Sequence, residues 1–202
     1  MNKSETMEQK LNFAYGSIQD IQETIRFLDT KAGAIIILIT AITTAIIAIM
    51  DSFILFFINQ TVTCKNILLS GCILFAIFMY ITLYLSIKAI HPRNNPNEHV
   101  IIGDDKNELI LSYFVSGFSS KMRVSDYIKE RKDLKSRISV TEHYRAILES
   151  TPEQILLTLS YEIIKLSYIR DKKNKRTCCA LNCLLLGFLI AFITTILYFI
   201  FR

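Results

Sequence analysis

The first part of the chain carries apolar side chains at alternating intervals of three and four residues. This spacing aligns them along one side of a helix, and here it runs from a charged segment into an uncharged one. The aligned positions, called the first seam below, are Leu11, Ala14, Ile18, Ile21, Ile25, Leu28, Ala32 and Ile35. Because Gln19, Glu23 and Arg26 lie on the opposite side, the pattern predicts an amphipathic helix that needs a partner.

A second helix with the same spacing is predicted from Thr151 onward. Pro152 lies in its first turn and Gln154 follows Thr151 by three residues, a capping box that satisfies exposed backbone N–H groups. A second seam then follows at Leu156, Leu159, Ile163 and Leu166. Both helices lead into uncharged segments, so they can pack in parallel, within one chain or between chains. The seams could only stabilise a bundle, or they could transmit movement from a polar domain into the bilayer.

Three segments are long, apolar and free of charge, and each matches the thickness of a hydrocarbon core of roughly 30 Å. The sequence therefore predicts an all-α membrane protein with three transmembrane helices and a helical cytoplasmic domain. Long helices should be continuous with the first and third spans. The expected divisions are a cytoplasmic amphipathic helix over 1–31, transmembrane helices over 32–50, 66–87 and 178–201, an extracytoplasmic turn over 51–65, and a cytoplasmic helical sensor region over 88–177.

The distribution of Lys and Arg predicts the orientation of the three spans. Cations gather in "RDKKNKR" before the third span and in "KAIHPR" after the second, whereas Lys65 is the one cation in the turn between the first two. Because cationic loops stay on the cytoplasmic side, the N-terminus and the middle region should face inward. The C-terminus and Cys64 should then face outward.

The spans contain few polar groups, mainly threonines, at Thr40, Thr43, Thr44, Thr194 and Thr195. Their hydroxyls could support helix packing or line a pore in an oligomer. The sequence contains no glycine-rich phosphate loop, nucleophile elbow, paired catalytic carboxylates or zinc-ligand spacing. We therefore expect no enzyme activity, no metal and no disulfide framework. The cations of the middle region could form a solvated face, a contact to lipid headgroups or part of an anion pocket.

Four stretches in a fixed order carry a family resemblance. They are "FLDTKAGAIIILIT", then "HPR" after the second span, then "LILSYFVSGFS", then "EQILLTLSYEIIKLSYIRDK" leading into the last span. Together they resemble the Pycsar transmembrane effectors of bacterial antiphage defence, over nearly the whole chain. The resemblance implies an inner-membrane protein that is silent until a partner nucleotide cyclase makes a cyclic pyrimidine mononucleotide, cUMP or cCMP. The activated effector then impairs the membrane, and growth of the infected cell stops, as in abortive infection.

The resemblance also suggests where a ligand would bind. A nucleotide phosphate needs cations or backbone N–H groups, and a base needs an aromatic or apolar wall. Lys121, Arg123 and Arg145 are the candidates for the phosphate, and Tyr113 and Tyr127 for the base. No nucleic acid is expected as a partner.

Asp29 and Lys31 stand at the entry to the first span and allow two interpretations. Asp29 could pair with Arg26 on its own helix while the Lys31 side chain reaches lipid phosphate. Alternatively, both could pair with cytoplasmic groups such as Arg93 or Arg170 and hold a resting arrangement.

Two other classes of protein remain open at this point. One is an effector similar to the SLATT-type membrane proteins, triggered by another nucleotide or by a protein. The other is a regulatory membrane subunit without killing activity. In each case the two seams and the small residues of the spans predict a homo-oligomer, whose number of subunits the sequence does not give.

Overall fold

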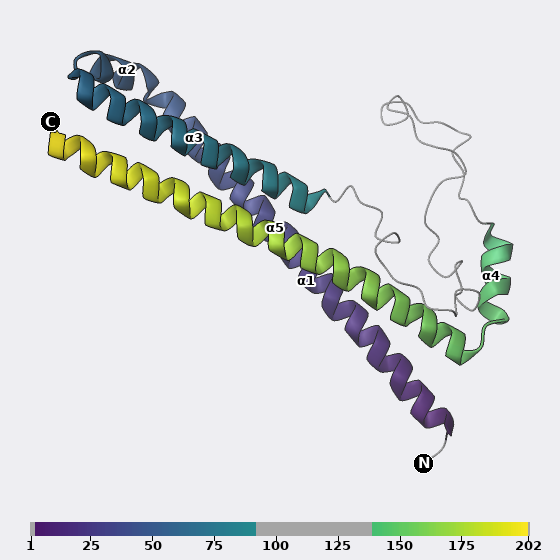
Figure 1. The fold of residues 1–202 in the computed structure, drawn as a ribbon. Coiled ribbons are helices and arrows are strands. Elements are labelled where there is room, and N and C mark those ends of the chain that lie inside the picture. Colours follow the sequence, from purple (N-terminus) through teal and green to yellow (C-terminus); the bar gives the residue numbers. More distant parts are fainter. Residues whose placement is uncertain (1–2, 92–138, 202) are drawn as a thin grey trace. The chain divides into compact units, whose positions relative to one another are not determined.

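The computed structural model describes residues 3–91 and 139–201, with side chains from Thr6 onward, and every regular element in these ranges is a helix. In chain order they are α1 (Lys3–Ala48), α2 (Met50–Ile58), α3 (Val62–Ile90), α4 (Val140–Leu148) and α5 (Pro152–Phe201), as Figure 1 shows. Three of them, α1, α3 and α5, are long and apolar enough to cross a membrane. The predicted all-α class and the three spans are thus confirmed.

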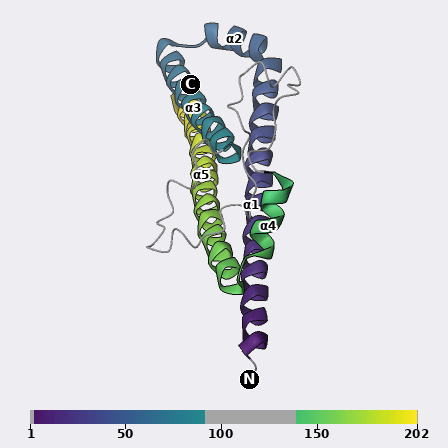
Figure 2. The same ribbon diagram turned by 90° about the vertical axis from the view of Figure 1, so that its right-hand side faces the viewer.

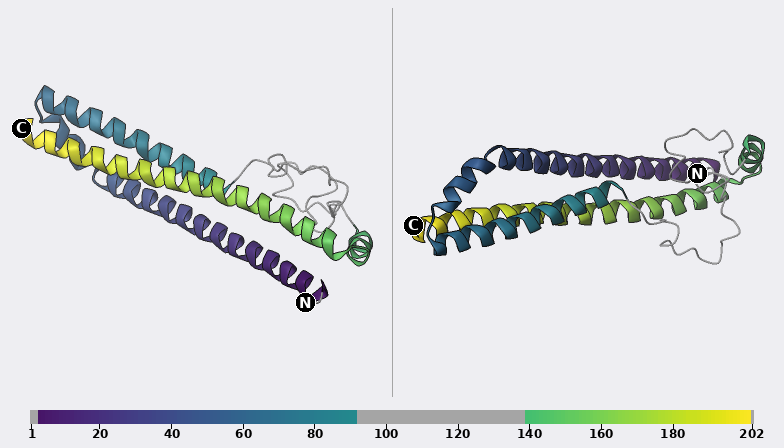
Figure 3. Two further views of the ribbon diagram at one scale, coloured as in Figure 1. Left: turned by 60° about the horizontal axis from the view of Figure 1, so that its bottom comes forward. Right: turned by 90° about the horizontal axis from the view of Figure 1, so that it is seen from above.

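Helices α1 and α5 contain 46 and 50 residues, and neither is interrupted where its charged part meets its apolar part. Figure 3 shows each of them as one continuous ribbon. The prediction that long helices continue into the first and third spans is therefore confirmed.

The chain forms two compact units, and both long helices contribute to each. One unit contains Met1–Asp20 and Asn97–Leu166, and the other contains Ile21–Pro96 and Ser167–Arg202. We call the second one the span unit, because it contains the apolar parts of α1, α3 and α5.

The core of the span unit is apolar and is made by all three long helices. Its buried members are Ile35 and Ile39 of α1, Met79 of α3, and Ala180 and Leu184 of α5. In water, burial of such side chains would stabilise the unit by the hydrophobic effect. Within a bilayer, the stabilisation comes instead from tight packing between the helices.

The first seam is the buried side of α1. Ala14, Ile21, Leu28, Ala32 and Ile35 are buried, and the other three members are partly buried. In the second seam Leu159 is completely buried and its other members are partly buried. The heptad spacing thus correctly predicted which face of each helix is covered.

The segment predicted as an outer turn contains a helix, α2, that joins α1 to α3 at the end of the span unit where α5 ends (Figure 2). Its Phe56 ring contacts the ring of Tyr198 on α5 edge to face, with 5.5 Å between the ring centroids. The Tyr198 hydroxyl donates to Oε1 of Gln60 over 3.3 Å. These contacts hold the segment between α1 and α3 against the C-terminal turn of α5.

Cys64 lies at the same end and is only 1% exposed. Its thiol donates to the carbonyl oxygen of Phe201 over 3.4 Å. A water-soluble reagent has little access to this thiol, so labelling of the native Cys64 does not report which side of the membrane this end faces.

Helices α3 and α5 lie close together at Gly71. A Cβ atom added to Gly71 would lie 2.2 Å from Oγ1 of Thr194, so only glycine fits there without movement. The Thr194 hydroxyl itself donates to the Ile190 carbonyl oxygen of its own helix. The hydroxyls of Thr40, Thr43, Thr44 and Thr195 likewise donate to carbonyl groups four residues earlier.

Candidate functional site

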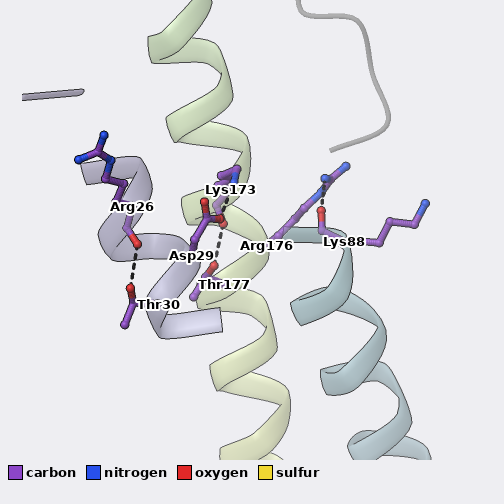
Figure 4. Close-up of polar contacts among 7 residues, drawn as sticks. All are labelled: Arg26, Asp29, Thr30, Lys88, Lys173, Arg176 and Thr177. Carbon is purple, nitrogen blue, oxygen red and sulfur yellow. Dashed lines mark hydrogen bonds and ion pairs between the residues drawn. The ribbon is translucent and has the colours of Figure 1, made fainter. Parts of the chain in front are cut away.

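A charged contact joins α1 to α5 in the span unit, at the border between polar and apolar sequence. The Lys173 ammonium donates to Oδ1 of Asp29 (Figure 4). Only 7% of the Lys173 side chain is exposed, against 37% for Asp29. Burial of an ammonium without a counter-charge costs free energy. The carboxylate of Asp29 offsets this cost for Lys173.

A second contact joins α5 to α3 one turn further along. Nη1 of Arg176 donates to the carbonyl oxygen of Lys88 over 2.6 Å. That carbonyl belongs to the last turn of α3, where backbone acceptors lack partners within the helix. The guanidinium satisfies one of them, and its positive charge is also stabilised by the helix dipole.

Both contacts start from the sequence "RDKKNKR" of α5. Residues three apart on a helix lie on neighbouring faces, so Lys173 can reach α1 while Arg176 reaches α3. Thr177, which is buried beside them, donates its hydroxyl to the Lys173 carbonyl oxygen over 3.0 Å and leaves no unsatisfied group. We call Asp29, Lys173, Arg176 and the Lys88 carbonyl the polar junction. It links all three long helices at the level where their charged parts end.

The predicted residues at the entry to the first span are placed as follows. Asp29 pairs with Lys173, and the Lys31 ammonium lies over the ring of Phe27, 5.2 Å from its centroid. Arg170 bonds to its neighbour Asp171, over 3.0 Å from Nε and 2.9 Å from Nη2. The structure thus joins α1 to α5 through Lys173 rather than Arg170, and Arg93 lies outside the described residues.

Sequence reasoning passed over Lys173 as a site residue, although a signal was present. Lys173 follows Leu159 by fourteen residues and Leu166 by seven, which places all three on one side of α5. A lysine on an otherwise apolar seam requires a partner across the interface, and the carboxylate of Asp29 supplies it.

Of the proposed ligand-binding residues, only Arg145 is among those described, and it lies exposed in the last turn of α4. Lys121, Arg123, Tyr113 and Tyr127 fall outside the described ranges. Helix α4 begins with a capping box in which Ser139 and Glu142 satisfy each other's backbone N–H groups. The hydrogen bonds from the Ser139 backbone and hydroxyl lower the pKa of Glu142 below its usual value.

A comparison with protein families matches most of the chain. The model of the Pycsar effector protein domain (PycTM) matches residues 13–200, which covers α1 from Phe13 and nearly all of α5. No curated protein and no solved structure gives a match to the chain. The family match extends over almost the entire sequence and includes every residue of the polar junction. The chain therefore belongs to the Pycsar effector family of antiphage defence proteins.

Proposed function

We propose that this chain is an inner-membrane effector that a cyclic pyrimidine mononucleotide, cUMP or cCMP, converts from a resting to a membrane-impairing arrangement. The observation that carries the proposal is the polar junction between continuous helices. Because α1 and α5 do not break between their charged and apolar parts, movement of either charged part can displace the attached span. A ligand-binding region can thus act on the bilayer without a separate linker.

The polar junction is the element that we propose to hold the resting arrangement. Sliding or rotating α1 against α5 would separate Asp29 from Lys173 and leave a buried ammonium without its counter-charge. Breaking a fully buried pair costs about 3–5 kcal/mol. Since Asp29 is partly exposed, about 1–3 kcal/mol is the appropriate scale here. A free-energy difference of this size between the two arrangements keeps the active form in the minority and is small enough for a ligand to overcome.

Activation by a nucleotide requires differential affinity. A ligand that binds both arrangements equally leaves the ratio of resting to active protein unchanged. The cyclic mononucleotide must therefore bind the active arrangement more tightly. We propose that a partner cyclase supplies this ligand during infection. Lys121, Arg123 and Arg145, with Tyr113 and Tyr127, remain the proposed contacts.

Impairment of the membrane is proposed to involve several copies of the chain. The three long helices of one copy pack around an apolar core, so a water-filled route would need helices from further copies. Large apolar side chains such as Ile37, Phe192 and Phe199 are exposed on the spans and meet lipid or another copy. The proposed effect is physical rather than enzymatic, and it stops growth of the infected cell.

The proposal can be tested in bacteria that produce the chain together with an active pyrimidine cyclase or with an inactive variant of the same cyclase. Loss of membrane potential, followed with a potential-sensitive dye, should occur only with the active cyclase. Equal depolarisation with both cyclases would instead favour a constitutive or protein-triggered effector similar to the SLATT type. No depolarisation with either would favour a regulatory subunit.

A further inference from the structure

A groove lies between α1 and α5 in the span unit, next to the polar junction. Its volume is about 240 Å³, and Leu28, Lys31 and Leu38 of α1 line it together with Asn174, Leu181 and Leu184 of α5. The two helices run in the same direction here, as Figure 1 shows. The polar groups of the lining, on Lys31, Asn174 and Thr177, therefore lie toward one end of the groove, and the other end is apolar on both sides.

The polarity along this groove matches that of a phospholipid. Lys31, Asn174 and Thr177 line the end near the charged sequence together with the apolar Leu28, whereas Leu38, Leu181 and Leu184 line the end within the spans. Seven residues separate Lys31 from Leu38, which corresponds to about 10 Å along the helix axis. A phosphate at the first end would thus place an acyl chain along the leucines.

The charge at the polar end is positive. Asp29 neutralises Lys173, which leaves the exposed Lys31 as the cation that lines the groove. Its ammonium lies over the Phe27 ring, and a ring face holds a cation without cancelling its charge. An anion at this position is therefore stabilised.

We propose that an anionic membrane phospholipid occupies the groove, with its phosphate at Lys31 and one acyl chain along Leu38, Leu181 and Leu184. The lining offers one cation near one end and leucines at the other, which the phosphate and one acyl chain of a single phospholipid match. The lipid joins α1 to α5 at the level of the polar junction. This proposal holds whether or not a nucleotide activates the protein.

The chain contains no tryptophan, which allows a direct test with a single introduced one. Leu38→Trp places the fluorophore in the groove, and lipids with brominated acyl chains quench it on contact. In bilayers that mix phosphatidylglycerol with phosphatidylcholine, brominated phosphatidylglycerol should compete about fivefold better, the scale of one lysine near an anionic surface. Leu181→Trp reports on the same groove from α5 and serves as a second reporter.

Matched controls separate the groove from a general attraction of cations for anionic lipid. Ile81→Trp on α3 is exposed and lies seven residues from Lys88, so it has the same cation spacing but lines no part of this groove. It should show no preference above twofold. Adding Lys31→Gln to Leu38→Trp should abolish the preference, and adding Lys175→Gln, an exposed cation outside the groove lining, should preserve it. Equal preference at Leu38 and Ile81, or a preference that survives Lys31→Gln, would overturn the proposal.

Discussion

Lys173 of α5 contacts the carboxylate of Asp29 on α1, and it does so from a position on the apolar seam of its helix. Its side chain is almost completely buried, and within residues 3–91 and 139–201 Asp29 is the acidic group that it contacts. Apolar seams allow two helices to slide by a heptad with little loss of packing, whereas a buried charged pair fixes a single register. The pair therefore defines one arrangement of α1 and α5 and gives any alternative arrangement a cost.

Replacing Asp29 by Asn should weaken the resting arrangement. The amide keeps the shape of the side chain but leaves the Lys173 ammonium without a counter-charge, at a cost of about 1–3 kcal/mol. We expect a lower Tm in detergent and, in cells without a cyclase, partial loss of membrane potential. Combining Asp29→Lys with Lys173→Asp restores an opposite charge pair, so the Tm and the membrane potential should return most of the way to their wild-type values.

Asp171→Asn is the matched control for this variant, because Asp171 forms an exposed pair with its neighbour Arg170. It should change neither the Tm nor the potential measurably. The pair would be a structural contact without a role in restraint if Asp29→Asn lowered the Tm but left the membrane potential as in the wild type, both without a cyclase and with an active one.

Gly71→Ala should destabilise the contact between α3 and α5. The new methyl group overlaps the Thr194 side chain, and relief of such overpacking typically costs about 1–3 kcal/mol. Thermal unfolding in detergent measures the change, and adding Thr194→Ala should recover part of the loss. Gly33→Ala is the control, because a methyl group there meets open space and a helical glycine gains stability from alanine. Equal effects of the two alanine variants would contradict the close approach at Gly71.

The orientation of the chain can be tested with single cysteines in a variant without native ones. Val62→Cys lies at the start of α3, where Val62 is 74% exposed, and should react with a membrane-impermeant thiol reagent in intact spheroplasts. Gln9→Cys is exposed on the charged part of α1 and should react only after permeabilisation. The reverse labelling pattern would invert the predicted topology. The native Cys64 is unsuitable because it is buried.

Much of the fold follows from local sequence patterns. The two seams and the absence of a break before "AGAIIILIT" and after "RDKKNKR" are sufficient to predict α1 and α5 as continuous helices. Helix α2 was not predicted, because the short apolar stretch "SFILFFI" has no periodicity that distinguishes a helix from a turn. Burial of Cys64 depends on where the end of α5 lies, and no local pattern contains that information.

The polar junction was predicted only in part. Asp29 was identified from its position at the entry to the first span, but its partner was not. Lys173 is one of several cations in "RDKKNKR". The orientation of the spans already accounts for a cluster of cations there, so no single one was identified as a site residue. Which of them faces Asp29 depends on the register between α1 and α5, and heptad spacing alone permits several registers.

Purified protein in liposomes offers the most direct test of the central claim, that a cyclic pyrimidine mononucleotide alone switches this chain to a membrane-impairing state. The measurement is release of a trapped fluorescent dye after addition of cUMP, cCMP or, as a purine control, cAMP. We predict release with at least one pyrimidine nucleotide, none with cAMP and none from protein-free liposomes. Release that is equal with and without nucleotide, or no release with either pyrimidine nucleotide, would contradict the account.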